Sequence, residues 1–153
     1  MRICLLVSTL LACAGCVGIE AGTHGSLKGY RYSTSKYVLE KVIHNVITKS
    51  NLFYQDSVKD YYNDDTAYIT LHVPEGEYVY KYTFRYYGDK EYWDTSRTAE
   101  IFIAIVHTEM RDGRSVPVRK YNAEVKKELT ERFEHAFISK IDSSLGMKHK
   151  VES

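Results

Sequence analysis

The sequence predicts an α+β domain of two layers. An antiparallel meander of three to four strands is flanked in the chain by two helices that pack on one face of the sheet. Apolar residues recur with a helical period in residues 34–50 and 122–142. Between these segments they alternate with a period of two, and turn-forming residues separate the alternating runs. Helices placed before and after hairpin-linked strands are typical of the α+β class.

Residues 34–50 have the pattern of an amphipathic helix. Ser33 or Ser35 suits its N-terminal cap, and Asn51 suits its end. Lys36 falls on the opposite side, which we expect to face solvent. Because several of the apolar residues are β-branched, packing rather than intrinsic propensity must stabilise this helix. The predicted buried face consists of Leu39, Val42, Ile43, Val46 and Ile47.

Three strands are predicted to follow a polar and acidic loop at residues 51–65, which has room for one helical turn. The first two strands span 66–73 and 77–87, and Pro74-Glu75-Gly76 forms the turn between them. In the second strand, aromatic rings occupy every other position, and we expect them to face the helices. These rings are Tyr78, Tyr80, Tyr82, Phe84 and Tyr86.

The third strand spans 98–110, and its alternation places Ile103, Ile105 and His107 on one face. This position predicts that His107 is a hydrogen-bonded histidine in the core. Asp112-Gly113 is a strong hairpin signal, and it predicts a short edge strand at 114–118. Pro117 is consistent with an edge because proline has no N–H to donate.

Residues 122–142 are predicted to form the second long helix, with Asn122 as its N-terminal cap. Its predicted buried face consists of Val125, Leu129, Phe133, Ala136, Phe137 and Ile141. The residues from Gly146 onward are polar, so we expect 146–153 to be a frayed tail.

The first sixteen residues have the pattern of an export signal. Arg2 precedes an apolar run from Ile3 to Ala12, which is too short to span a bilayer and fits the apolar region of a cleaved signal. The run ends in small residues and two cysteines, and the segment resembles a bacterial lipoprotein signal peptide. In such signals small residues precede the cysteine that is lipidated. Cys16 fits this position, and Cys13 is the alternative.

The resemblance implies a domain organisation and a location. Residues 1–16 form the signal ending at the lipidated cysteine, 17–29 a flexible tether, 30–145 a single folded domain and 146–153 the tail. The lipid anchor binds a membrane of the bacterial cell envelope. Because Val17 rather than Asp follows Cys16, the outer membrane is favoured by analogy. Ordinary secretion is the alternative, with cleavage after Ala14.

Composition and spacing exclude several classes of function. The chain has 21 basic and 20 acidic residues, and one of the basic residues, Arg2, lies in the leader. This balance predicts no nucleic-acid partner, and no polybasic block predicts binding to anionic lipid. The six histidines and the acidic residues lack the spacing of zinc and calcium sites. We therefore expect no metal and no cofactor.

The tyrosine-rich strand is the first candidate for a contact surface. Tyr78, Tyr80 and Tyr82 belong to the core in the interpretation that the strand period favours. In the other interpretation they line a groove in which a sugar or a peptide stacks on the rings.

The segment 87–94 is the second candidate, because it contains the single tryptophan and lies at the predicted end of a strand. Tyr87, Tyr92 and Trp93 either anchor a partner protein or close over the core as a lid.

These observations favour a lipid-anchored envelope protein that acts as a non-catalytic binding or assembly accessory, with another envelope protein as its partner. The sequence leaves two alternatives open. One is a small-ligand or glycan binder with a tyrosine-lined groove. The other is a small hydrolase without a recognisable motif, since none of the known catalytic motifs is present.

Overall fold

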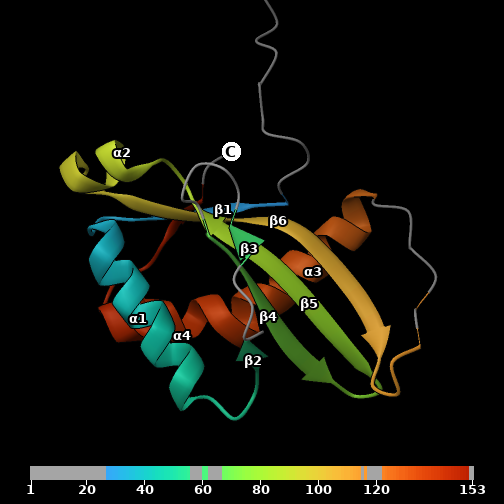
Figure 1. Cartoon of the computed structure of the whole chain (residues 1–153). Coiled ribbons are helices and arrows are strands. Elements are labelled where there is room, and N and C mark those ends of the chain that lie inside the picture. The colour runs from blue at the N-terminus through green and yellow to red at the C-terminus, as the bar shows by residue number, and fades with distance from the viewer. Residues whose placement is uncertain (1–26, 56–59, 62–66, 115, 117–121, 152–153) are drawn as a thin grey trace, which may run out of the picture.

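A computed structural model describes residues 27–55, 60–61, 67–114, 116 and 122–151. Its long helical segments, α1 and α3–α4, lie on one side of an antiparallel sheet, which confirms the predicted α+β class (Figure 1). The strand order is β2–β4–β5–β6–β1–β7, and β3 also pairs with β4. The strands are β1 Gly29–Tyr32, β2 Tyr54–Gln55, β3 Asp60–Tyr61, β4 Ala67–Glu75, β5 Tyr78–Tyr86, β6 Ala99–Met110 and β7 Lys150–Val151.

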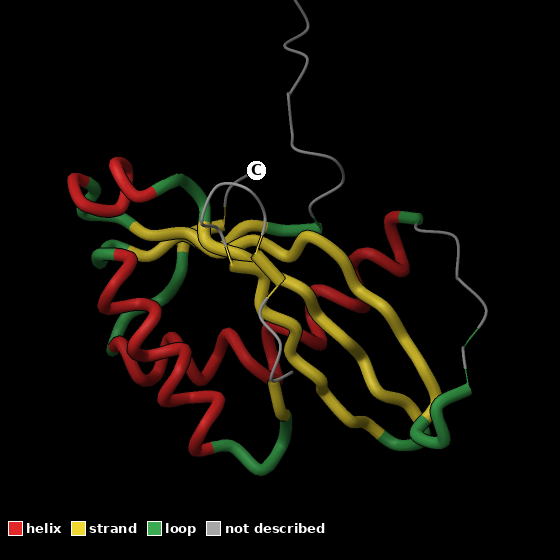
Figure 2. Tube along the Cα trace, in the orientation of Figure 1, coloured by secondary structure: helices red, strands yellow, loops and turns green. Residues whose placement is uncertain are grey.

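Two long helical segments cover the sheet, as predicted, and Figure 2 shows both on the same side. The N-terminal caps are Ser35, which accepts a hydrogen bond from the Val38 N–H, and Asn122, which accepts one from the Val125 N–H. The first helix ends at Ser50 in extended backbone, one residue before the predicted Asn51. The helices are α1 Lys36–Lys49, α2 Lys90–Thr95, α3 Ala123–Phe133, the π-helix η1 Glu134–Ile138 and α4 Ser139–Leu145.

The aromatic row of β5 packs against the C-terminal helical segment. The rings of Tyr82 and Phe133 have centroids 4.8 Å apart, and the Tyr82 hydroxyl donates to the Leu129 carbonyl at 3.0 Å. Phe84 contacts both Phe133 and Phe137. The π-helix widens one turn, and its residues Phe137 and Ile138 are both buried in the core.

The opposite face of the sheet is largely polar. Lys81 and Glu109 form a cross-strand ion pair at 2.8 Å, and the Thr70 and Thr83 hydroxyls lie 3.0 Å apart. Such pairs satisfy polar side chains on a sheet face and stabilise the pairing of neighbouring strands. The meander β4–β5–β6 therefore has the predicted arrangement, with its aromatic face inside.

A β-bulge in β6 makes one prediction wrong. Thr83 pairs with Ile105, but the next residue, Phe84, pairs with Ile103, so β6 has one extra residue at this point. The extra residue reverses the faces of the strand beyond it. Ile105 and His107 are consequently exposed, and His107 is not a core histidine.

The predicted boundaries fail where short strands form by long-range pairing. Residues 17–29 were predicted as a tether, but Leu27 is buried, its N–H donates to the Ile103 carbonyl, and β1 begins at Gly29. β2 and β3 lie within the predicted loop 51–65. β7 lies within the predicted tail 146–153 and pairs with β1.

The two hairpin turns lie at or close to their predicted positions. β4 continues through Pro74 and Glu75, and the first hairpin turns at Gly76-Glu77, where Gly76 has a positive φ of 58°. The Asp112-Gly113 hairpin is present, and the Met110 N–H donates to the Arg114 carbonyl. Most of the predicted edge strand 114–118, including Pro117, lies outside the described residues.

None of the helices in the described ranges has the length and apolar character needed to cross a bilayer.

The bulge gives a matched test within one strand. Ile103 is fully buried and Ile105 is 61% exposed. We expect Ile103→Ala to lower the free energy of unfolding by about 2–5 kcal/mol, because it leaves a cavity in the core. Ile105→Ala should change it by less than about 0.5 kcal/mol. Chemical denaturation of both variants measures the difference, and equal losses would show that β6 alternates without a bulge.

Candidate functional site

The segment 87–94 folds back over the core. Trp93 lies in α2, packs against the hydrophobic core, and donates its indole N–H to the Tyr87 carbonyl at 2.7 Å. Asp89 caps the helix by accepting the Tyr92 N–H at 2.9 Å. Of the two sequence-based interpretations, the structure therefore favours the lid for Trp93. We call residues 87–95 the α2 lid.

Lys36 holds the α2 lid to α1. Its ammonium nitrogen lies 4.7 Å from the ring centroid of Trp93, 5.0 Å from that of Tyr86 and 5.4 Å from that of Tyr37. A cation over aromatic faces is attracted by their electron density. The side chain of Lys36 is only 12% exposed, so its predicted position on the solvent side is wrong. Glu40 completes the site with an ion pair to Lys36 at 2.8 Å.

Polar contacts fasten the outer side of the lid. The Tyr37 hydroxyl donates to Asp94, and Lys90 forms an ion pair with Asp94 at 2.7 Å. The hydrogen bond from Lys90, followed by the one from Tyr37, lowers the pKa of the Asp94 carboxyl. Tyr37 of α1 and Tyr87, the first residue of the lid, are each 50% exposed. The Tyr37 hydroxyl bonds to Asp94, and the Tyr87 ring packs edge-on against Tyr92. Two half-exposed tyrosines therefore lie at the lid, within reach of solvent.

The other predicted contact residues do not join this surface. Tyr82 is fully buried, which excludes it as a contact residue in the folded protein. Tyr80 is half-buried beneath Arg132, whose guanidinium lies 4.4 Å from the ring centroid. Tyr78 is partly exposed at the far end of β5 from Tyr87. Of this row only Tyr82 belongs fully to the core, and the exposed Tyr78 lies at the opposite end of β5 from Tyr87.

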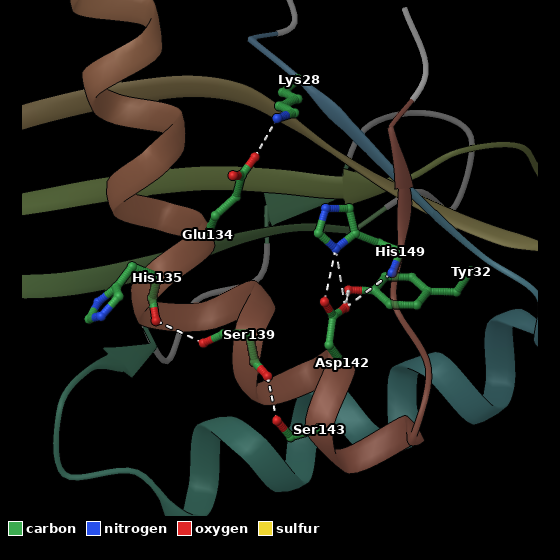
Figure 3. Close-up of polar contacts among 8 residues, drawn as sticks. All are labelled: Lys28, Tyr32, Glu134, His135, Ser139, Asp142, Ser143 and His149. Carbon is green, nitrogen blue, oxygen red and sulfur yellow. Dashed lines mark hydrogen bonds and ion pairs between the residues drawn. The ribbon is translucent and has the colours of Figure 1, made fainter.

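A cluster that the sequence analysis missed lies between β1 and α4 (Figure 3). Asp142 accepts a hydrogen bond from the Tyr32 hydroxyl at 3.0 Å. It also accepts the backbone N–H of His149 at 3.3 Å, and Nδ1 of the His149 ring lies 3.1 Å from its second oxygen. Gly146, in the left-handed conformation with φ 65°, turns the chain so that His149 returns to Asp142.

The pair of His149 and Asp142 resembles the base and the orienting acid of a catalytic triad, but its contacts are structural. The imidazole packs edge-on against Tyr30, with ring centroids 5.2 Å apart, and directs its other nitrogen away from Asp142 (Figure 3). The hydroxyls of Ser139 and Ser143 donate to backbone carbonyls of their own helix. Asp142 and His149 therefore fix the chain just before β7, which pairs with β1.

The buried tyrosines around the cluster and the lid resist ionisation. Burial raises the phenol pKa of Tyr30, Tyr32 and Tyr86 well above the ordinary value. The carboxylates of Glu134 and Asp142 raise the pKa of Tyr30 and Tyr32 further. Lys28 forms an ion pair with Glu134 across this side of the sheet (Figure 3).

No group of three or more metal-ligating side chains occurs in the described ranges. Cys16 and Cys13, the predicted lipidation residues, lie outside them. Comparison with protein-family models, with curated proteins and with solved structures found no match to this chain.

The single tryptophan makes the lid directly testable. We expect Lys36→Ala to loosen the α2 lid, because three rings lose the cation between them, and the effect should be about 0.5–2 kcal/mol. The emission of Trp93 should shift to the red and become more accessible to a soluble quencher. Lys41→Ala, an exposed lysine of the same helix, is the control. An unchanged Trp93 spectrum in Lys36→Ala would contradict the role of Lys36.

The buried phenols predict a loss of stability in alkali. Unfolded tyrosines ionise near pH 10.0, whereas these three remain protonated in the folded protein. Above that pH the folded state binds more protons than the unfolded state, so stability is complete below about pH 10 and falls as the pH rises. Tyrosinate absorbance should therefore show phenols that ionise only as the protein unfolds. The control is Tyr86→Phe, which should lessen the alkaline loss.

Proposed function

We propose that this chain is a lipid-anchored protein of the bacterial cell envelope whose folded domain binds another envelope protein and catalyses no reaction. The observation behind the anchor is the position of the cysteines. All 3 cysteines lie in the first sixteen residues, at and before the end of an apolar leader. A domain held together by disulfides would need cysteines in its body. Val17 favours the outer membrane as the destination, with secretion as the alternative.

The contacts of the polar residues support binding over catalysis. A hydrolase that uses a side-chain nucleophile needs it within hydrogen-bonding reach of its base. Ser139 and Ser143, which lie in the same helix as Asp142, direct their hydroxyls to backbone carbonyls. Asp142 is occupied by Tyr32 and by both the backbone and the ring of His149. The burial of Tyr82 likewise removes the centre of the proposed tyrosine groove, so the glycan-binding alternative is less favoured.

The surface around the α2 lid is the best candidate for the partner contact. Tyr37 and Tyr87 are half exposed, and each contacts a residue of α2, the helix that Trp93 and Asp94 fix. Tyrosines on a rigid support are frequent anchors of protein interfaces, since they bury a large area at a small cost in side-chain entropy. Trp93 itself stabilises the support and does not serve as the anchor.

The lipid anchor is tested by mass spectrometry of the protein made in a bacterium. We expect an amino terminus at Cys16 with about three acyl chains attached, because two or more chains are needed for a stable anchor. Cys16→Ser should abolish acylation and release the protein from membranes, and Cys13→Ser should change neither. Acylation that survives Cys16→Ser and is lost in Cys13→Ser would move the anchor to Cys13. An unprocessed amino terminus would refute the anchor.

The partner contact is tested by site-specific photocrosslinking in intact cells. A crosslinker at Tyr87 should capture one discrete envelope protein, because the exposed ring faces the partner. The matched control is a crosslinker at Ile105, which is at least as exposed but lies in β6 on the sheet. Neither substitution disturbs the core. Equal capture at both positions, or none at Tyr87, would count against the α2 lid as the interface.

A further inference from the structure

The proposed function leaves unused a groove between α1 and α4, two helices that pack against each other. Its volume is about 490 Å³, and Lys49 of α1 and Lys140 of α4 are among the residues that line it. Ser50 and Ser144 add hydroxyl groups, and Val42 and Val46 of α1 add an apolar surface. Two cations, hydroxyl donors and an apolar wall match an amphiphile with an anionic headgroup.

Among the described residues, no carboxylate neutralises the two lysines of the groove. Several other lysines pair with carboxylates, as in Lys28–Glu134, Lys81–Glu109 and Lys127–Glu131. Over the described ranges, neither Lys49 nor Lys140 has a carboxylate within 4.0 Å. Both ammonium groups are therefore available to an anion from solution or from a surface.

The surroundings of the groove are also poor in acids. The segment 41–55 contains no Asp or Glu. The segment 135–151 contains one, Asp142, which is held by Tyr32 and His149 on the side of β1. The same two segments contain three further lysines, Lys41, Lys148 and Lys150. The segments that supply the lining of the groove are therefore richer in basic than in acidic residues, although the chain is close to neutral overall.

An exposed aliphatic side chain adjoins the groove. Leu52 is 59% exposed, and its backbone N–H donates to the hydroxyl of Ser50, one of the lining residues. Lysines that attract anionic headgroups beside an aliphatic side chain that enters the interface are a typical combination on membrane-binding surfaces.

We propose that this groove and Leu52 form a second contact with the membrane. Lys49 and Lys140 bind the phosphates of anionic phospholipids, and Leu52 enters the interfacial layer. The inference rests on the proposed anchor, which keeps the domain near the bilayer and so raises the effective concentration of headgroups. The eleven Cα–Cα steps from Cys16 to Leu27 span at most about 40 Å. This reach keeps the folded domain, and with it the groove, close to the same bilayer.

Lysine footprinting of the full, processed protein tests the contact. The protein is reconstituted into vesicles of phosphatidylcholine alone or with one third phosphatidylglycerol, and an amine-reactive reagent labels its lysines. We expect Lys49 and Lys140 to react about fivefold more slowly on the anionic vesicles, and high salt should remove the difference. Lys90 and Lys126, exposed on α2 and α3, should react equally on both. Equal rates for Lys49 and Lys140 would overturn the proposal.

Matched variants separate the headgroup contact from other causes. Lys140→Gln should reduce the protection of Lys49, whereas Lys126→Gln on α3 should not. Leu52→Ser should weaken the protection of both lysines, whereas Ile105→Ser, which is equally exposed on β6, should not. Circular dichroism confirms that each variant is folded. If the groove lysines remain equally protected in Lys140→Gln and in Leu52→Ser, the groove is excluded as the membrane contact.

A further experiment distinguishes a lipid headgroup from free phosphate as the bound anion. Inorganic phosphate is added to detergent-solubilised protein without lipid, and we expect no protection at millimolar concentrations. Full protection by phosphate alone would identify a site for a small soluble anion and overturn the membrane contact. Whether the protein is acylated is measured independently, by mass spectrometry of its amino terminus. If acylation is absent, sedimentation with anionic vesicles still reports whether the groove binds them.

Discussion

The packing of one aromatic strand against one helical segment is the constraint on which the rest of the structure depends. Tyr82 and Phe84 of β5 meet Phe133 and Phe137 of the C-terminal helices, and the Tyr82 hydroxyl bonds to the Leu129 carbonyl. This contact fixes the distance between sheet and helices and leaves α1 to fill the remaining half of the sheet. Large rings bury the most apolar area per residue, so a domain of this size gains much of its stability from few contacts.

The sequence pattern was sufficient to predict those parts of the fold that depend on residues of a single segment. The caps Ser35 and Asn122, the meander and the inner face of β5 all follow from spacing within one segment. The bulge in β6 and the strands β1, β2 and β7 do not, because each depends on a partner that is remote in the chain. A segment of two to four residues, such as Lys150–Val151, is too short to show a periodic pattern from which a strand could be predicted.

The same limit explains the outcome for the candidate site. Tyr87, Tyr92 and Trp93 were recognisable because aromatic residues gather in one short segment. The role of Lys36 was not, since its helical position indicated solvent and only the return of α2 over α1 places three rings around it. His149 and Lys140 gain their neighbours in the same way, from turns and helix crossings that composition does not encode.

The position of β1 has a consequence for handling the protein. β1 lies between β6 and β7, so the strand at which the N-terminal segment joins the domain pairs directly with the strand at its C-terminal end (Figure 1). A purification tag or fluorescent fusion at the C-terminal end would join the domain through β7, beside the strand at which the N-terminal segment enters it. Such an appendage would crowd the short pairing between β7 and β1, whereas an insertion in the Asp112-Gly113 turn would leave that pairing undisturbed.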